Sequence, residues 1–131
     1  MVHNIIIKKE ITTNILVDLL SMAFSGGIGY WCSLVDYDED EYKASKEKIK
    51  AEGIAEPCWE DVLVQMLEDG KSIIIVDDEE DERYKLTLNK LLNGIELNYR
   101  HRPHDCDIEE GDAETADCII QYALFYDVIY G

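Results

Sequence analysis

Two strand-like runs, Ile73-Ile74-Ile75-Val76 and Arg83-Tyr84-Lys85-Leu86, flank six consecutive carboxylates, Asp77-Asp78-Glu79-Glu80-Asp81-Glu82. Short runs of this kind on either side of a polar turn are typical of a β-hairpin. The sequence therefore predicts a hairpin whose loop is rich in carboxylates. The whole chain is acidic, with a formal net charge of −17 over 131 residues, and this loop has its longest run of consecutive carboxylates.

Helical patterns surround the hairpin. Apolar residues recur at helical spacing after Thr12 or Thr13, after Pro57, after Thr87, and after Asp112 or Thr115, and residues 38–52 form a more polar helix. Residues 5–8 and 30–35 are predicted strands, Gly26-Gly27 ends the first helix, and residues 100–111 form a polar loop. This order predicts a single α+β domain over residues 1–131, with helices packed on a short, mostly antiparallel sheet.

Composition limits the class of protein. The 131 residues, 47% of them hydrophobic, can bury one core and leave no room for a second domain. No apolar run approaches the roughly 18 residues of a membrane-spanning helix. Residues 1–4 lack the features of a secretory signal, and the four cysteines form no CxxC pair. We therefore expect no membrane association and a cytoplasmic location.

Three further segments resemble a known family. They are Gly26-Gly27-Ile28-Gly29-Tyr30-Trp31-Cys32, residues 84–95 (YKLTLNKLLNGI), and residues 116–131, which begin ADCIIQYALF. The chain resembles a family of short acidic proteins encoded by phages and prophages of Firmicutes, which has no established activity. The resemblance implies a mobile-element setting and a host bacterial cytoplasm, and it implies no chemistry. Residues 38–56 depart from the family pattern, because they contain more lysine.

The negative charge is unevenly distributed. The first 35 residues are formally neutral, which predicts a buried scaffold, and three acidic blocks follow at 36–41, 77–82 and 105–117. The hairpin loop has two main interpretations. It is either a solvated turn that keeps strand edges from pairing, or a mimic of nucleic-acid phosphates, because alternate strand residues lie roughly 6.6 Å apart. Weak binding of divalent cations is a third interpretation, although no DxDxDG loop is present.

The phosphate-mimic interpretation predicts a partner-binding surface made of exposed carboxylates. Such a surface displaces DNA or RNA from a basic groove, because nucleic-acid-binding proteins gain much of their affinity from phosphate contacts. Capping of the last helix explains Asp112 and Glu114. The candidate binding residues are Asp36, Asp38, Glu39, Asp40, Glu41, Asp77, Asp78, Glu79, Glu80, Asp81, Glu82, Asp105, Asp107, Glu109 and Glu110.

Other reactive residues give weaker patterns. His101, His104 and Cys106 form H-x-x-H-x-C, but a zinc site needs a fourth ligand, and a solvated loop is the favoured interpretation. Cys32 lies beside Trp31 without a nearby basic residue and is predicted to be a core thiol. The chain contains no GxSxG, HExxH or P-loop motif. We therefore expect no metal, no cofactor and no enzymatic activity.

These observations predict a phage-encoded acidic binding protein. Its expected partner is a host or defence-system protein with a basic nucleic-acid groove, so that the chain is an inhibitor of the anti-CRISPR or anti-restriction type that does not bind nucleic acid itself. The alternative is a small-molecule sponge or ligand-binding module. In that case Tyr30, Trp31, Tyr122 and Tyr126 line a pocket between the subunits of a homodimer.

Overall fold

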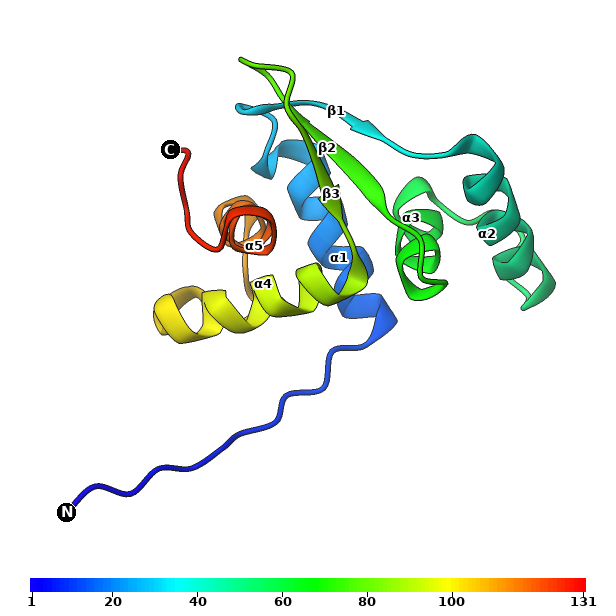
Figure 1. Cartoon of the computed structure of the whole chain (residues 1–131). Coiled ribbons are helices and arrows are strands. Elements are labelled where there is room, and N and C mark those ends of the chain that lie inside the picture. Colours follow the sequence, from blue (N-terminus) through cyan, green and yellow to red (C-terminus); the bar gives the residue numbers. More distant parts are fainter.

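A computed structural model describes all 131 residues of the chain (Figure 1). In chain order the elements are α1 (Thr13–Met22), the π-helical turn η1 (Ala23–Gly27), β1 (Cys32–Asp36), α2 (Glu39–Ala51), α3 (Trp59–Glu68), β2 (Ile73–Asp77), β3 (Arg83–Leu86), α4 (Leu88–His101), the 3-10 turn η2 (Pro103–Asp105) and α5 (Ala113–Phe125). The chain is a single small α+β domain, as the sequence predicts. None of its helices has the length and apolar composition needed to cross a membrane.

The three strands form one sheet in the order β1-β2-β3, with both pairs antiparallel. In the predicted hairpin, Ile73 pairs with Leu86 and Val76 pairs with Arg83. β2 is the central strand. Ile73 and Ile75 are fully buried on one face, and on the other face Val76 is buried and Ile74 is half-buried, which explains the unbroken apolar run. The hairpin prediction is therefore confirmed, and the sheet is antiparallel throughout.

The helices begin close to the predicted positions because polar side chains cap them. Side-chain oxygens of Thr12, Asp38, Thr87 and Asp112 accept backbone N–H groups in the first turns of α1, α2, α4 and α5. The third helix begins at Trp59 instead of Pro57, with Cys58 as its N-cap. α4 continues to His101, so the predicted polar loop is shorter than 100–111 and contains η2.

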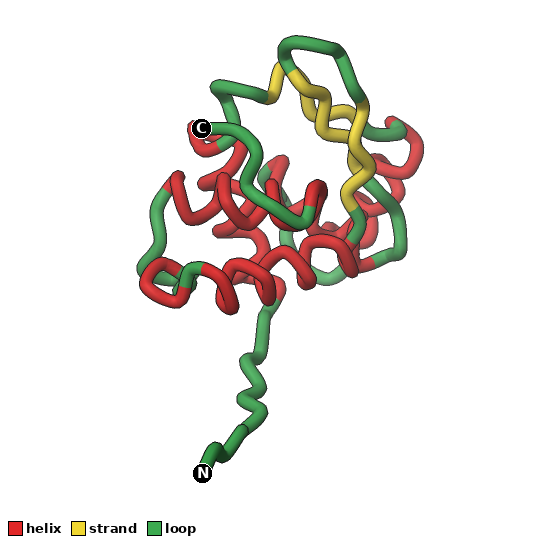
Figure 2. The backbone as a smooth tube through the Cα atoms, turned by 60° about the vertical axis from the view of Figure 1, so that its left-hand side comes forward, coloured by secondary structure: helices red, strands yellow, loops and turns green.

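Packing between helices builds most of the core. Contacts join α4 to α5, α2 to α3, and α1 to both α3 and α5. Figure 2 shows the strands on one side of the molecule and most of the helices on the other. The 21 buried apolar residues of the main cluster come from the helices α1, α3, α4 and α5, from η1, from the strands β2 and β3, and from loops. One contiguous core results, as expected for a chain of this length.

The structure corrects two predictions for the amino-terminal segment. Residues 1–11 form neither helix nor strand, residues 1–10 are all exposed, and the segment projects from the body (Figures 1 and 2). None of its backbone N–H or C=O groups makes a hydrogen bond within the chain. A strand requires a pairing partner. The sheet contains only β1, β2 and β3, and residues 5–8 pair with neither of its edge strands. The buried scaffold therefore starts at α1 and not at the first residue.

Candidate functional site

The hairpin tip, defined as residues 78–82, presents five carboxylates to solvent. All five residues are exposed, and Asp81 turns the chain with a positive φ of 54°. The turn is closed by the Asp77 N–H, which donates to the Glu82 carbonyl at 3.0 Å. The tip therefore concentrates five negative charges at one protruding point.

Asp77 differs from the five residues that follow it, because it is only 4% exposed. Its carboxylate accepts the backbone N–H groups of Glu79 and Glu80 at 3.1 and 2.7 Å and the Tyr130 hydroxyl at 2.9 Å. Hydrogen bonding from the Glu80 N–H, more than any other contact, lowers the pKa of Asp77. Asp77 was predicted to belong to the exposed binding surface, but its buried carboxylate instead accepts hydrogen bonds that shape the tip.

A hydrogen-bonded cluster around the buried Asp117 side chain, which we call the Asp117 cluster, supports the tip. Asp117 of α5 accepts the Tyr30 hydroxyl at 2.6 Å, the Trp31 indole N–H at 2.8 Å and the Gln121 amide at 2.9 Å. The Trp31 carbonyl in turn accepts the Asp78 N–H at 2.8 Å. Burial, together with the hydrogen bond to Asp117, raises the pKa of Tyr30 to about 12. The cluster thus connects the last helix to the base of the hairpin tip.

The end of the chain completes this support. The Tyr130 ring stacks on Trp31 with 4.8 Å between ring centroids and 6° between planes. The Gln121 side-chain oxygen accepts the backbone N–H groups of Ile129 and Tyr130, both at 2.8 Å. Burial, followed by the hydrogen bond to Asp77, raises the pKa of Tyr130. Residues distant in sequence therefore hold the tip in a fixed position.

A small cavity of about 280 Å³ lies beside the tip. It is lined by Tyr30, Trp31, Asp77, Asp78, Glu79, Tyr130 and Gly131. It contains three carboxylates and no basic residue, so it does not suit an anionic nucleotide. Of the four aromatic residues in the predicted pocket, Tyr30 and Trp31 line this cavity, whereas Tyr122 and Tyr126 do not. The rings of Trp31 and Tyr122 are buried within the chain, which does not favour a shared pocket between subunits.

The first acidic block, residues 36–41, has mixed roles. Asp36 forms an ion pair with Arg83 across the sheet, and the hydrogen bond from Arg83 lowers the pKa of Asp36. Asp38 caps α2 by accepting the Glu41 N–H at 3.0 Å, and the Glu41 carboxylate lies 3.4 Å from Lys71. The remaining members, Glu39 and Asp40, are exposed and form no ion pair.

The third block is also partly structural. Asp105 is half-buried, accepts a hydrogen bond from Arg102 at 2.8 Å and contacts the Thr115 hydroxyl. Asp107 accepts the Glu109 N–H at 3.0 Å, and Glu109 and Glu110 are exposed. Figure 1 places α2 at one end of the molecule and the end of α4, from which this loop starts, at the other. The three acidic blocks therefore do not form one continuous face.

The residues considered for metal binding and nucleophilic catalysis have other environments. No group of three or more His, Cys, Asp or Glu side chains is placed to hold a metal ion. His101 stacks on Tyr122, and the Cys106 thiol donates to the Pro103 carbonyl at 3.3 Å. Cys32 is half-buried instead of fully buried, and burial raises the pKa of its thiol. A raised pKa favours the thiol over the nucleophilic thiolate at neutral pH.

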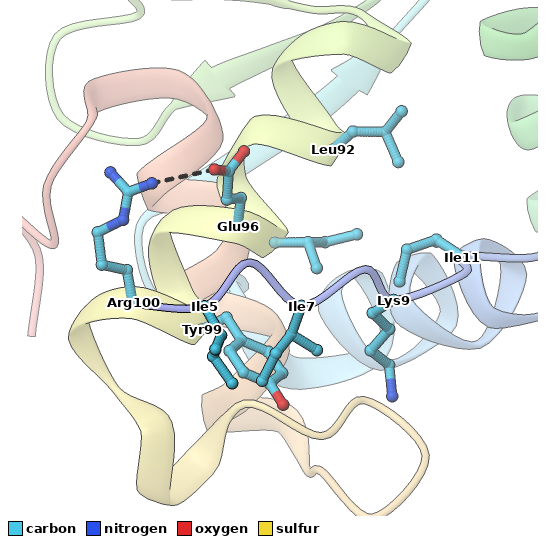
Figure 3. Close-up of a pocket in the computed structure, with 9 residues that line it drawn as sticks. Ile5, Ile7, Lys9, Ile11, Leu92, Glu96, Tyr99 and Arg100 are labelled. Carbon is cyan, nitrogen blue, oxygen red and sulfur yellow. Dashed lines mark hydrogen bonds and ion pairs between the residues drawn. The ribbon is translucent and has the colours of Figure 1, made fainter. Parts of the chain in front are cut away.

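A larger apolar groove, which the sequence did not predict, lies elsewhere on the molecule. It has a volume of about 810 Å³ and lies between the amino-terminal segment and α4 (Figure 3). Its lining residues are Ile5, Ile7, Lys9, Ile11, Leu92, Ile95, Glu96, Tyr99 and Arg100. The only sequence feature that points to this groove is the run Ile5-Ile6-Ile7. This run predicts a strand, but it does not indicate that the strand lacks a partner in its own chain.

Comparison with known proteins identifies no relative: no protein-family profile, curated protein or solved structure matches the chain.

Proposed function

We propose that the protein acts by binding, and that its hairpin tip occupies the basic nucleic-acid groove of another protein and keeps DNA or RNA out. The observation that supports this proposal is the group of five exposed carboxylates on one turn, residues 78–82. The turn is held by Asp77, Trp31 and Tyr130. Because the tip is already ordered, binding does not have to order it, which favours affinity.

Electrostatics favours this use of the tip. Proteins with a basic groove gain much of their affinity for nucleic acid from phosphate contacts, and a compact group of carboxylates competes for the same Lys and Arg side chains. The nearest hairpin cation, Arg83, pairs with Asp36 and leaves the tip charges uncompensated. In the phage setting that the family resemblance implies, the target is a host or defence nucleic-acid enzyme, as for anti-CRISPR or anti-restriction inhibitors.

Not every candidate residue has the same role in the proposal. Asp36, Asp38, Asp77 and Asp105 accept hydrogen bonds or pair with cations inside the fold. Four other exposed carboxylates, Glu39, Asp40, Glu109 and Glu110, lie on surfaces separate from the tip and are available for additional contacts. The main binding determinant is therefore the tip.

A matched pair of variants tests the proposal. The tip variant carries Asp78→Asn, Glu79→Gln, Glu80→Gln, Asp81→Asn and Glu82→Gln. The control neutralises the same number of exposed carboxylates elsewhere, by Glu10→Gln, Asp18→Asn, Glu47→Gln, Glu52→Gln and Glu56→Gln. Both changes alter net charge equally, so only the tip position differs.

The wild type and each variant are used to capture proteins from nuclease-treated host lysate. Each captured protein is then bound to labelled DNA or RNA, and displacement of the nucleic acid by the wild type or a variant is followed by fluorescence anisotropy. We expect the wild type and the control to displace the nucleic acid, and the tip variant to lose at least about tenfold in potency. Displacement should weaken as salt rises from 50 to 500 mM, because exposed charges are screened over about 10 Å at 0.1 M. Equal displacement by the tip variant would contradict the proposal.

A further inference from the structure

Residues 2–9, which we call the arm, have the composition of a strand but no partner. Ile5, Ile6 and Ile7 are 81%, 95% and 74% exposed. β-Branched residues favour extended backbone, and a strand is stable only when its N–H and C=O groups are paired. Within this chain the arm makes no backbone hydrogen bond. It is therefore an apolar strand edge that is open on both sides.

The side chains of the arm alternate between two environments. Ile5 and Ile7 line the groove together with Leu92 and Tyr99 of α4, whereas Ile6 does not line it (Figure 3). This alternation is the one expected of extended backbone, in which residues two apart share a face. One face of the arm therefore already points toward the α4 surface, and its backbone edges remain free to pair.

We propose that the arm pairs antiparallel with the arm of a second copy of this chain, and that the paired arms cover the α4 grooves of both copies. The run Ile5-Ile6-Ile7 is self-complementary about Ile6: in a two-fold pairing Ile5 opposes Ile7, and Ile6 opposes Ile6. The opposed Ile5 and Ile7 side chains of both copies then share the groove face. In one copy alone Ile5 and Ile7 are largely exposed, and the second arm covers them.

Charge also favours a second copy at this place. Lys8 and Lys9 are the only Lys, Arg, Asp or Glu residues among the first nine, while the whole chain has a net charge of −17. In the pairing centred on Ile6, Lys8 opposes Asn4 and Lys9 opposes His3, so no lysine opposes another lysine. Two such acidic copies repel each other over most of their surfaces, and the arm is the segment that best tolerates their approach.

This inference does not depend on the proposed function, and salt separates the two. Binding of the acidic tip to a basic groove weakens as salt rises, because attraction is screened. Pairing of the arms should strengthen as salt rises, because repulsion between the two acidic bodies is screened while the apolar contact persists. Either interaction can therefore fail without affecting the test of the other.

Mass measurement tests the pairing. Sedimentation equilibrium of the full chain from about 5 to 500 μM, a range in which weak and moderate associations populate a dimer, should show a shift from 15.1 kDa toward twice that mass. Ile6→Lys should weaken the dimer at least about tenfold, because it removes the central apolar contact and opposes two charges. Ile54→Lys is the control, since Ile54 is also exposed but lies outside the groove.

Cross-linking tests the register. Opposed residues in an antiparallel pair have Cα atoms about 4.5–5.5 Å apart, within the range that a disulfide spans. The test uses a Cys58→Ser background, because the Cys58 thiol is free and exposed. Under oxidised glutathione, Ile6→Cys in this background should form a covalent dimer, whereas Ile54→Cys and the background chain itself should not. A chain that stays at 15.1 kDa over the whole range, or a dimer that Ile6→Lys leaves unchanged, would overturn the proposal.

Discussion

Replacing Asp117 by alanine should destabilise the protein more than any loss of a surface carboxylate. Asp117 is 6% exposed and accepts three hydrogen bonds from neutral donors, with no cation among its hydrogen-bond partners. Alanine leaves the Trp31 indole N–H and the Gln121 amide without their main acceptor. Both of these residues are buried, so water does not replace the lost acceptor easily. The Tyr30 residue is exposed, and its hydroxyl can bond to water.

The expected magnitude follows from this geometry. A buried donor that loses its partner costs about 1–3 kcal/mol, and two donors are affected. The Gln121 amide retains longer contacts of 3.4 Å to Tyr30 and to the Tyr130 carbonyl, which reduces its share. We therefore expect a loss of about 3 kcal/mol of unfolding free energy, a large part of the roughly 5–15 kcal/mol of a typical domain.

Asp117→Asn is the informative comparison. The amide oxygen still accepts from Trp31 and Gln121, and the amide nitrogen donates to the Tyr30 oxygen, which has free lone pairs. We expect a loss of about 1 kcal/mol or less, since only the charge assistance of these bonds disappears. Asp18→Ala, which removes an exposed carboxylate with no hydrogen bond, serves as the control for net charge.

Urea unfolding followed by tryptophan fluorescence measures all three variants, because Trp31 lies in the cluster. With a typical slope of about 1.5–2 kcal/mol per molar urea, Asp117→Ala should lower the midpoint by about 1.5–2 M. If Asp117→Asn costs as much as Asp117→Ala, the negative charge stabilises the cluster and the hydrogen-bond argument is wrong. A loss below about 1 kcal/mol in Asp117→Ala would show that the donors find other acceptors.

Two further predictions concern helix packing and pH. A Cβ at Gly94 would lie 2.6 Å from the Ile119 carbonyl oxygen, so Gly94→Ala should force α4 from α5 and lower the free energy of unfolding by about 1–3 kcal/mol. The control is Asn89→Ala at an exposed position of the same helix, which should be neutral or slightly stabilising. Thermal unfolding measures both variants. Hydrogen bonding from the Glu80 N–H is the main reason that the pKa of Asp77 is lower in the folded state than its ordinary value. The ionised Asp77 therefore contributes its full stabilisation above the ordinary carboxyl pKa, and this stabilisation is lost as pH falls through the folded-state pKa. Asp77→Asn should therefore flatten the dependence of the thermal midpoint on pH below about 4, and an unchanged profile would contradict this role.

Local sequence patterns predicted much of the fold because the forces behind them are local. Thr12, Asp38 and Thr87 indicate helix starts because the side-chain oxygen of each residue accepts a backbone N–H group in the first turn of its helix. The hairpin was predictable because its two strands adjoin one turn. The strand predicted at residues 5–8 was wrong because a strand depends on a partner, and β propensity does not show whether one exists in the same chain.

Much of the support of the candidate site was not predictable from sequence because it is long-range. Asp117 meets Trp31 across 86 residues, and Asp77 meets Tyr130 across 53. Asp77 looks like its five acidic neighbours in sequence, although an Asp that opens a turn commonly accepts N–H groups two and three residues later. That local rule could have separated Asp77 from the exposed tip, but the Tyr130 contact could not have been inferred.

The distribution of charge links the fold to the two proposed interactions. Carboxylates of Asp36, Asp77 and Asp105 are used by hydrogen bonds or an ion pair inside the fold, so their charge stabilises local structure. The hairpin tip retains charge that nothing in the chain compensates, which suits a basic partner. The arm contains apolar surface and two lysines, which suit a second acidic copy. Because the arm and the tip are made of different residues, neutralising the tip should weaken binding to the basic partner while strengthening, or leaving unchanged, association through the arm.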